Sequence, residues 1–373
     1  MDRKRVTIKD VAARAGVSIA TVSNVFSGNK PVNAELRERV EKAAKELSYQ
    51  LDRAASQLRS GHARVVGVLV PDLDDVFFTS LVSRIEVMGM RDGYDVIVAS
   101  SRDDTELEES RLRALLGWRP SGLIAVPCSD TVPALLKKEA GHLPMVFADR
   151  IAPEGSFVDT VAIDNHEAGA IAAAYLLEQG HREIVLAASN LAISPIRERI
   201  RGVVDVMQKR TGMQPTVIEL SSNGERGIEI FSRWLERNAH PFAIIGLTNV
   251  TTLSALSALA RHHIDIPETV SVIGFDDYPW MSARKTALTA IRQPIEEMAQ
   301  VIWERLSKRM AGDRSAPHHA VLNTSLQVRN SVRALPRGSV QPARVDGGLR
   351  DGLSGSVSAV ADAPATMPLP AGK

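Results

Sequence analysis

The chain contains very little cysteine, few aromatic residues and no long apolar run. One cysteine, Cys128, stands among 373 residues, which excludes an internal disulfide framework and fits a reducing compartment. Aromatic residues make up only 4% of the chain, so its cores must rest on Val, Ile, Leu and Ala. The start, MDRKRVTIKD, lacks the apolar segment of a secretory signal, and no apolar run is long enough to cross a bilayer. We therefore expect a cytoplasmic protein without a membrane partner.

The net charge is only +1, but it is unevenly distributed. Residues 1–64 hold 13 Lys and Arg against 7 Asp and Glu, a balance of +6, so the rest of the chain carries −5. A basic head on a mildly acidic body indicates a polyanionic partner for the head alone. A solvated basic surface is the alternative that charge by itself leaves open.

Residues 6–49 have the pattern of three short helices. Thr7 followed by Asp10 is typical of a helix N-terminus, and Gly16 permits a sharp turn before Ser18 caps a second helix. Asn33 can cap a third helix, whose apolar residues recur at helical spacing. A helix, a glycine turn and a second capped helix form a helix-turn-helix, whose second helix enters the DNA major groove.

From residue 65 onward, buried strands alternate with helical stretches. Nine apolar segments have the pattern of strands: 65–71, 94–100, 122–127, 145–149, 160–164, 183–189, 216–220, 243–249 and 270–277. Such alternation, with helices such as 167–180 between the strands, predicts parallel sheets built from βαβ units. We expect two doubly wound subdomains that bind ligands at the carboxyl ends of their strands. Residues 334–373 lack periodicity and are rich in Gly, Pro, Ser and Ala, which predicts a disordered tail.

The segment VTIKDVAARAGVSIATVSNVFSGNKPVNAELRERVEKAAKELSY closely resembles the amino-terminal domain of the lactose/galactose repressor family (LacI/GalR). The resemblance continues through AASQLRSG, GVLVPDLDDVFF, IDNHEAGAIAAAYLLEQGHREI, VSVIGFDD and LTAIRQP, and it covers residues 6–333. It implies a small all-α helix-turn-helix head (1–49), a linker with a hinge helix (50–64) and an α/β core like that of periplasmic binding proteins (65–333). One doubly wound parallel-sheet subdomain then holds about 65–163 and 292–320, and the other about 164–291 and 321–333.

The resemblance implies which residues of the head contact operator DNA. The matching positions are Thr7, Ser18, Ile19, Ala20, Thr21, Ser23, Asn24 and Asn29. Ile19 and Ala20 offer apolar contact to thymine methyl groups, and Asn24 can pair with adenine. Many family members have arginine at the position of Asn24, so the outer bases of the operator are left open. For Ile19, packing between helices is the alternative.

The linker matches the family's minor-groove contacts. Leu58 stands at the position of an apolar wedge that unstacks a base step and bends the duplex, supported by Ala54, Ala55 and Arg59. Two linker helices from two copies of the chain order one another at the operator centre, which implies a homodimer. A leucine that only packs against the partner helix is the alternative reading of Leu58.

The core matches the family's effector pocket. The candidate residues are Asp75, Phe77, Phe78, Asp149, Arg199, Asn249, Asp276 and Trp280. Asp75 begins DVFF where the family usually has Asn-Pro-Phe-Phe, which changes the charge of the pocket. Arg199 and Asp276 match effector-contacting positions, and Trp280 can stack on a pyranose face, whereas Phe77 fits the core as well as the pocket. Several carboxylates against one arginine favour a sugar or polyol, while a sugar acid stays open because Arg199 could hold its carboxylate.

Together these patterns predict a homodimeric DNA-binding transcription regulator. We expect a repressor that binds a near-palindromic operator on the bacterial nucleoid and that a sugar or sugar acid controls. No cofactor, metal ion or catalytic residue is expected, because the adjacent His262-His263 and His318-His319 pairs do not suit metal binding and no catalytic motif stands out. A sugar-binding protein and a sugar-acting enzyme, both without a regulatory role, are the alternatives. The sequence leaves open the identity of the effector, whether it acts as inducer or corepressor, the operator sequence, whether the protein is a dimer or a tetramer, and the role of the tail.

Overall fold

The computed structural model describes residues 6–27, 31–49, 64–150, 157–238 and 243–336. Residues 50–63 of the predicted linker and 337–373 of the predicted tail lie outside these ranges. Residues 334–336 are described, and the backbone N–H of Leu335 donates to the carbonyl oxygen of Gln179 at 2.7 Å. In the described ranges, no helix is both long enough and apolar enough to cross a membrane.

The head consists of three helices, α1 (Ile8–Ala15), α2 (Ile19–Ser27) and α3 (Ala34–Glu46). Small apolar side chains, among them the fully buried Val11, Val22 and Val40, form one core between them. Gly16 ends α1 with a φ of 63°, and a Cβ there would lie 2.9 Å from Nη2 of Arg39. Because Nη2 of Arg39 donates to the carbonyl oxygen of Ala15 at 2.7 Å, α3 is tied to the turn between α1 and α2.

The first subdomain of the core is built on a parallel six-stranded sheet. Its strands, in the order β11-β5-β4-β3-β1-β2, are β11 (His319–Leu322), β5 (Asp159–Ile163), β4 (Met145–Ala148), β3 (Gly122–Ala125), β1 (Val65–Val70) and β2 (Asp95–Ser100). Its helices are α5 (Val76–Arg91), α6 (Thr105–Gly117), α7 (Ala134–Glu139) and α13 (Ile295–Met310). Residues of β1, β3 and β4 are buried throughout, as expected for strands covered on both faces.

The second subdomain repeats this plan. Its sheet, in the order β12-β10-β9-β8-β6-β7, contains β12 (Ser325–Gln327), β10 (Thr289–Arg292), β9 (Ser271–Phe275), β8 (Ala243–Gly246), β6 (Ile184–Ala188) and β7 (Thr216–Glu219). Only β12 runs antiparallel to its neighbour among these strands. The helices are α8 (Asn165–Glu178), α9 (Ser194–Thr211), α10 (Gly224–Leu235), α11 (Asn249–Arg261) and α12 (Pro279–Ser282).

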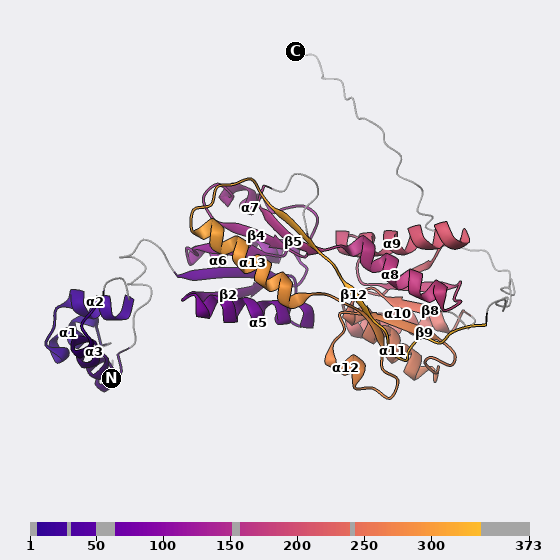
Figure 1. The fold of residues 1–373 in the computed structure, drawn as a ribbon, viewed down its shortest axis with the longest axis horizontal. Coiled ribbons are helices and arrows are strands. Elements are labelled where there is room, and N and C mark those ends of the chain that lie inside the picture. The colour runs from indigo at the N-terminus through magenta and orange to yellow at the C-terminus, as the bar shows by residue number, and fades with distance from the viewer. Residues whose placement is uncertain (1–5, 28–30, 50–63, 151–156, 239–242, 337–373) are drawn as a thin grey trace, which may run out of the picture. The chain divides into compact units, whose positions relative to one another are not determined.

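The chain passes between the two sheets three times: between β5 and α8, between β10 and α13, and between β11 and β12. As a result α13, drawn orange in Figure 1, packs against α5 and the strands β3 to β5 of the first subdomain, far from its sequence neighbours. Sheet membership changes at residues 163–165, 292–295 and 322–325, close to the three positions expected from the sequence.

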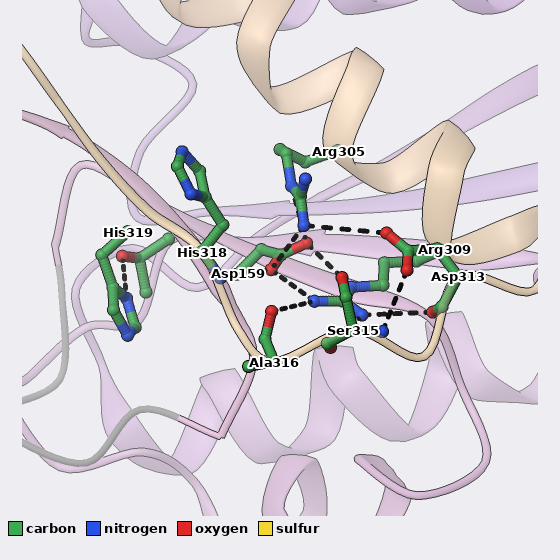
Figure 2. Close-up of polar contacts among 9 residues, drawn as sticks. Asp159, Arg305, Arg309, Asp313, Ser315, Ala316, His318 and His319 are labelled. Carbon is green, nitrogen blue, oxygen red and sulfur yellow. Dashed lines mark hydrogen bonds and ion pairs between the residues drawn. The ribbon is translucent and has the colours of Figure 1, made fainter.

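A buried carboxylate anchors the segment that leads from α13 into β11 (Figure 2). Asp159, the first residue of β5, accepts hydrogen bonds from Arg305, from Nη2 of Arg309 at 2.8 Å and from the backbone N–H of His318 at 2.7 Å. Burial would raise the pKa of Asp159, but the hydrogen bonds from Arg309 and Arg305 lower it to about 2. The charged carboxylate therefore fixes β11 beside β5.

A second buried carboxylate, Asp277, links β10 to β12. The chain enters the first subdomain after β10 and has returned from it at β12. The side chain of Asp277 is 1% exposed, and it binds Arg292 at the end of β10 and Arg329 just after β12, at 2.5 Å each. Burial would raise the pKa of Asp277, but Arg329 and Arg292 lower it. Two of the three crossovers thus meet at one ion-pair network.

The predicted fold class is confirmed, and all nine predicted strands are present. The predicted helix 167–180 is α8, which begins and ends two residues earlier. The strands β10, β11 and β12 were not predicted. In β11 exposed and half-buried residues alternate at the sheet edge, so no apolar run marks it.

Candidate functional site

Both helices of the predicted helix-turn-helix are capped as the sequence suggests. Oδ2 of Asp10 accepts hydrogen bonds from the backbone N–H of Thr7 at 2.8 Å and from its hydroxyl at 2.7 Å. Oγ of Ser18 accepts from the backbone N–H of Thr21 at 3.0 Å. These bonds satisfy N–H groups that the first turn of a helix leaves without a helical partner.

Helix α2 presents a narrow strip of side chains away from the head's core. Val22 and Val25 are buried, whereas Ile19 is 41% exposed and Ala20 is exposed as well. Ser23 and Asn24 are half-buried and lie one turn further along the same faces as Ile19 and Ala20. Among the other predicted DNA contacts, Thr7 and Ser18 are exposed and Thr21 is half-buried. The remaining ones, Asn29, Ala55, Leu58 and Arg59, lie outside the described residues.

A cavity that is partly open to solvent is lined by residues of both subdomains. Most of its polar lining follows directly after strands: Asp72 and Asp75 after β1, Asp103 after β2, Asp149 and Arg150 after β4, Ser189 after β6, Ser222 after β7, Thr248 after β8, Asp276 after β9 and Gln293 after β10. The carboxyl ends of parallel strands are where α/β folds bind ligands. The cavity is therefore the candidate effector site.

The structure brings most of the predicted pocket residues to this cavity. Its lining includes Asp75, Phe77, Phe78, Asp149, Arg199 and Asp276. Asn249 stands between the lining residues Thr248 and Val250 and is bonded to two of the acids. Trp280 is not part of the lining; it is half-buried and packs against the core of the second subdomain.

Arg199 is a buried cation of the site, with 4% of its surface exposed. Its Nε donates to Oδ1 of Asn165 at 2.8 Å and its Nη1 to the carbonyl oxygen of Leu247 at 2.5 Å, and its guanidinium lies 3.8 Å from the ring centre of Phe275. Helix α9 carries Arg199 so close to α8 that a Cβ at Gly169 would lie 2.0 Å from the carbonyl oxygen of Arg199. This close helix contact fixes the arginine.

A hydrogen-bonded bridge joins the two subdomains inside the cavity. Oδ1 of Asp75, at the N-terminus of α5, accepts from Nδ2 of Asn249 at 2.8 Å and from the backbone N–H of Phe77 at 2.9 Å. Asn249, at the start of α11, also donates its backbone N–H to Oδ2 of Asp276 at 3.1 Å. The Oδ1 atom of Asp276 accepts from Nε2 of Gln293 at 2.5 Å.

Burial shapes the ionisation of the three acids in this site. Burial, and then the charge of Asp276, raise the pKa of Asp75 to about 6. Burial also raises the pKa of Asp149 and Asp276, although the charge of Arg199 opposes both shifts. Burial lowers the pKa of Arg199. Negative charge in the cavity is thus only partly compensated.

Asp103 and Arg150 form an ion pair in the cavity wall that was not predicted. Nη1 of Arg150 donates to Asp103 and, at 3.2 Å, to the carbonyl oxygen of Cys128. The guanidinium lies 5.9 Å from the ring centre of Phe78. Both residues directly follow predicted strands, so the rule that ligands bind at strand ends was the available signal for them. The same rule points to Ser189.

Backbone strain is concentrated at the cavity. Asp103, Asp149 and Asp276 have φ values of 56°, 58° and 76°, in the left-handed region that residues with a Cβ rarely adopt. Such conformations cost about 1–3 kcal/mol each and cluster at binding sites. In the described part of the chain, no group of three or more His, Cys, Asp or Glu side chains is arranged to hold a metal ion. The arrangement suits the binding of a small polar ligand.

Comparison with known proteins agrees with this geometry. The family profile "Bacterial regulatory proteins, lacI family" matches residues 7–52, and "Periplasmic binding protein-like domain" matches residues 173–332. The chain is 31% identical over 334 residues to the HTH-type transcriptional regulator PtxS of Pseudomonas putida, covering 89% of this chain and 97% of that protein. It is likewise 31% identical to the HTH-type transcriptional repressor CytR of Escherichia coli, with coverage of 88% and 97%.

Solved structures of such regulators share the fold. A lac repressor dimer bound to operator and the anti-inducer ONPF has a TM-score of 0.77 and 27% identity, covering 89% of this chain and 100% of that one. A complex of the transcriptional regulator CelR with cellobiose has a TM-score of 0.64 and 27% identity, covering 88% and 100%. These relatives regulate transcription and are not enzymes, and this chain belongs to the lacI family of bacterial regulatory proteins.

Proposed function

We propose that this chain is a cytoplasmic repressor that binds a near-palindromic operator as a homodimer and is controlled by a small polyhydroxylated effector. The observation that carries the proposal is a cavity with five aspartates and a buried arginine on the same chain as a helix-turn-helix. Residues 1–49 bind DNA in this proposal, 50–64 form the hinge, 65–333 bind the effector, and 334–373 form a tail. A sugar-binding protein without a regulatory role would leave the basic head unexplained.

The recognition helix in this proposal is α2. The face of α2 that would enter the major groove carries the exposed Ile19 and Ala20 and the half-buried Ser23 and Asn24. Two copies on adjacent half-sites, with Leu58 of each linker at the operator centre, account for a palindromic site. The likeness to a lac repressor dimer bound to operator supports this arrangement.

An apolar strip on α5 supports the homodimer. Val76, Val87 and Met90 of this helix are 45%, 58% and 71% exposed. Helix α5 packs against β2, an outer strand of the first sheet. Exposed apolar side chains gathered on one helix are typical of an interface between proteins. A second copy of the chain would bury them.

The effector is proposed to be a sugar or sugar acid. Aspartate carboxylates and the hydroxyl groups of Ser189, Ser222 and Thr248 can bind several ligand hydroxyls, and Phe77 and Phe78 offer an apolar wall. The CelR regulator, 27% identical to this chain, binds the sugar cellobiose. An effector controls DNA binding only through different affinities for the operator-competent and operator-incompetent arrangements of the subdomains.

The test is a selection of DNA fragments from a randomised library and from genomic DNA with full-length protein. We expect enrichment of one near-palindromic sequence, with one half-site per head. A thermal-shift screen of sugars, polyols and sugar acids then identifies the effector, because a ligand that binds only the native state raises its melting temperature. The effector should change the affinity for the selected operator. The proposal fails if no duplex is preferred over random competitor, with or without a broad metabolite mixture.

A further inference from the structure

The effector cavity has an excess of acidic side chains. Among the described residues that line it, five aspartates (Asp72, Asp75, Asp103, Asp149 and Asp276) face two arginines, Arg150 and Arg199. Arg150 is already paired with Asp103. Arg199 donates to the neutral acceptors Asn165 and Leu247. The cavity therefore contains more negative charge than its own cations compensate.

Three of these carboxylates, those of Asp75, Asp149 and Asp276, share the positive charge of Arg199 without forming an ion pair with it. In the part of the chain that the structure describes, neither Asp75 nor Asp149 nor Asp276 has an ion-pair partner within 4.0 Å. Asp75 and Asp276 accept hydrogen bonds from neutral donors only. The carboxylate of Asp149, which is 7% exposed, accepts none from the described residues. A buried carboxylate without an ion pair destabilises the native state unless a partner supplies a positive charge or a hydrogen-bond donor.

We propose that the effector of this cleft carries a protonated amino group, which binds between the carboxylates of Asp75 and Asp149. This inference rests on the proposed role of the cleft as the effector site and names the class of ligand: an amino sugar or amino polyol. The hydroxyl groups of the ligand bind the remaining polar lining. Of the two ligand types left open by the proposed function, the sugar acid is thereby disfavoured, since its carboxylate would meet five aspartates and only two arginines.

Asp75 determines this specificity. An asparagine at this position would have nearly the same size but no charge. Its carboxylate lies at the N-terminus of α5, where aspartate and asparagine serve equally well as a cap. The helix therefore does not require the negative charge. Burial and Asp276 raise the pKa of Asp75 to about 6, so it is still ionised at pH 7 and available to an ammonium group.

The test uses full-length protein and matched ligands at pH 7. The probes are D-glucosamine, D-galactosamine and D-mannosamine, each with its parent hexose, its N-acetyl derivative and its uronic acid, and Tris with its neutral counterpart pentaerythritol. Thermal shift and titration calorimetry measure binding to the wild type, to Asp75→Asn and to Asp164→Asn. Asp164 is the control, because its side chain also caps a helix, accepting from the backbone N–H of Glu167 at the start of α8, but does not line the cavity.

We expect at least one amine to bind the wild type about 10- to 100-fold more tightly than its neutral and acidic counterparts, as a charge-assisted hydrogen bond implies. Asp75→Asn should lower the affinity for that amine by about tenfold or more, whereas Asp164→Asn should not change it. The proposal is overturned if no amine is preferred, if a neutral or acidic compound binds best, or if the preference persists in Asp75→Asn. Each of these outcomes leaves the proposed function intact, because operator selection tests that separately.

Discussion

Replacing Asp75 with asparagine should stabilise the ligand-free protein at neutral pH. Asparagine has nearly the same volume, and its carbonyl oxygen can still accept from the backbone N–H of Phe77 and from Nδ2 of Asn249, as Oδ1 of Asp75 does at 2.9 and 2.8 Å. The substitution therefore removes a charge and keeps both bonds. It separates the electrostatic role of Asp75 from its structural role.

The size of the effect follows from the pKa of Asp75. Burial and the charge of Asp276 raise it from 3.8 to about 6, and one pKa unit corresponds to about 1.4 kcal/mol. Ionised Asp75 therefore destabilises the native state by up to about 3 kcal/mol relative to a neutral side chain. With an unfolding entropy of about 2.1 cal/mol/K per residue, 1 kcal/mol shifts the melting temperature of a core the size of residues 65–333 by roughly 2 °C. We expect the variant to melt up to about 5 °C higher at pH 7.5.

The pH dependence gives the sharper test. Between pH 3.8 and about 6 the native state of the wild type holds a proton at Asp75 that the unfolded chain has released, so wild-type stability falls as the pH rises through this window. The variant has no such group. The difference in melting temperature should be near zero at pH 4, grow through pH 6 and stay constant above it.

Differential scanning calorimetry across this pH range measures the difference. Asp164→Asn is the control, since it makes the same change at the cap of α8 outside the cavity. It should alter stability by less than about 0.5 kcal/mol at every pH. A variant Asp75→Asn that melts below the wild type at pH 7.5, or whose advantage is the same at pH 4 and pH 7.5, would refute the electrostatic reasoning.

Three further substitutions test other parts of the molecule. Asn24→Ala should lose discrimination of roughly 1–3 kcal/mol at one or two base pairs, and an unchanged preferred sequence in a randomised-operator selection would contradict this role. Arg199→Met should keep operator binding, measured by fluorescence anisotropy, but abolish the response to the effector found in the screen; a normal response would exclude Arg199 from the site. Asp159→Asn should destabilise the core by about 2 kcal/mol at pH 7 in urea unfolding, because the charged carboxylate, with a pKa lowered to about 2, stabilises above the unfolded pKa of about 3.9 and loses this effect as the pH falls toward 2. An unchanged urea midpoint would show that Asp159 does not hold β11 in place.

Short stretches of sequence predict those strands and helix caps of this fold that depend on neighbouring residues. Most of the nine predicted strands are buried apolar runs, such as β1, and the cap bonds at Thr7 and Ser18 join residues three positions apart. The strands β10, β11 and β12 depend instead on partners far along the chain. β11 is held by Asp159, about 160 residues away in sequence, through the backbone N–H of His318 and two arginines of α13. No window of neighbouring residues contains that information.

The same distinction applies to the site. Strand ends and family motifs pointed to Asp75, Asp149, Arg199 and Asp276, all of which line the cavity. The pair of Arg150 with Asp103 joins residues 47 positions apart, and it depends on how two strand ends meet. An aromatic side chain near a strand end suggested a sugar-stacking role for Trp280, but Trp280 packs against the core of the second subdomain. Aromatic character alone does not distinguish a pocket wall from a core.

Several residues that break local rules in this core line the cavity that the effector is proposed to occupy. Positive φ values at Asp149 and Asp276, and the burial of the carboxylates of Asp75 and Asp149, each destabilise the ligand-free state, and such departures from local preference occur mainly at functional sites. The bond from Asn249 to Asp75 is also one of the bonds between the subdomains. In the proposed complex, a ligand cation at Asp75 would compete with Asn249 for the same carboxylate, so binding would change a contact between the subdomains. The charge proposed to select the ligand would then also be the means by which the ligand acts on the subdomain arrangement, and through it on the operator.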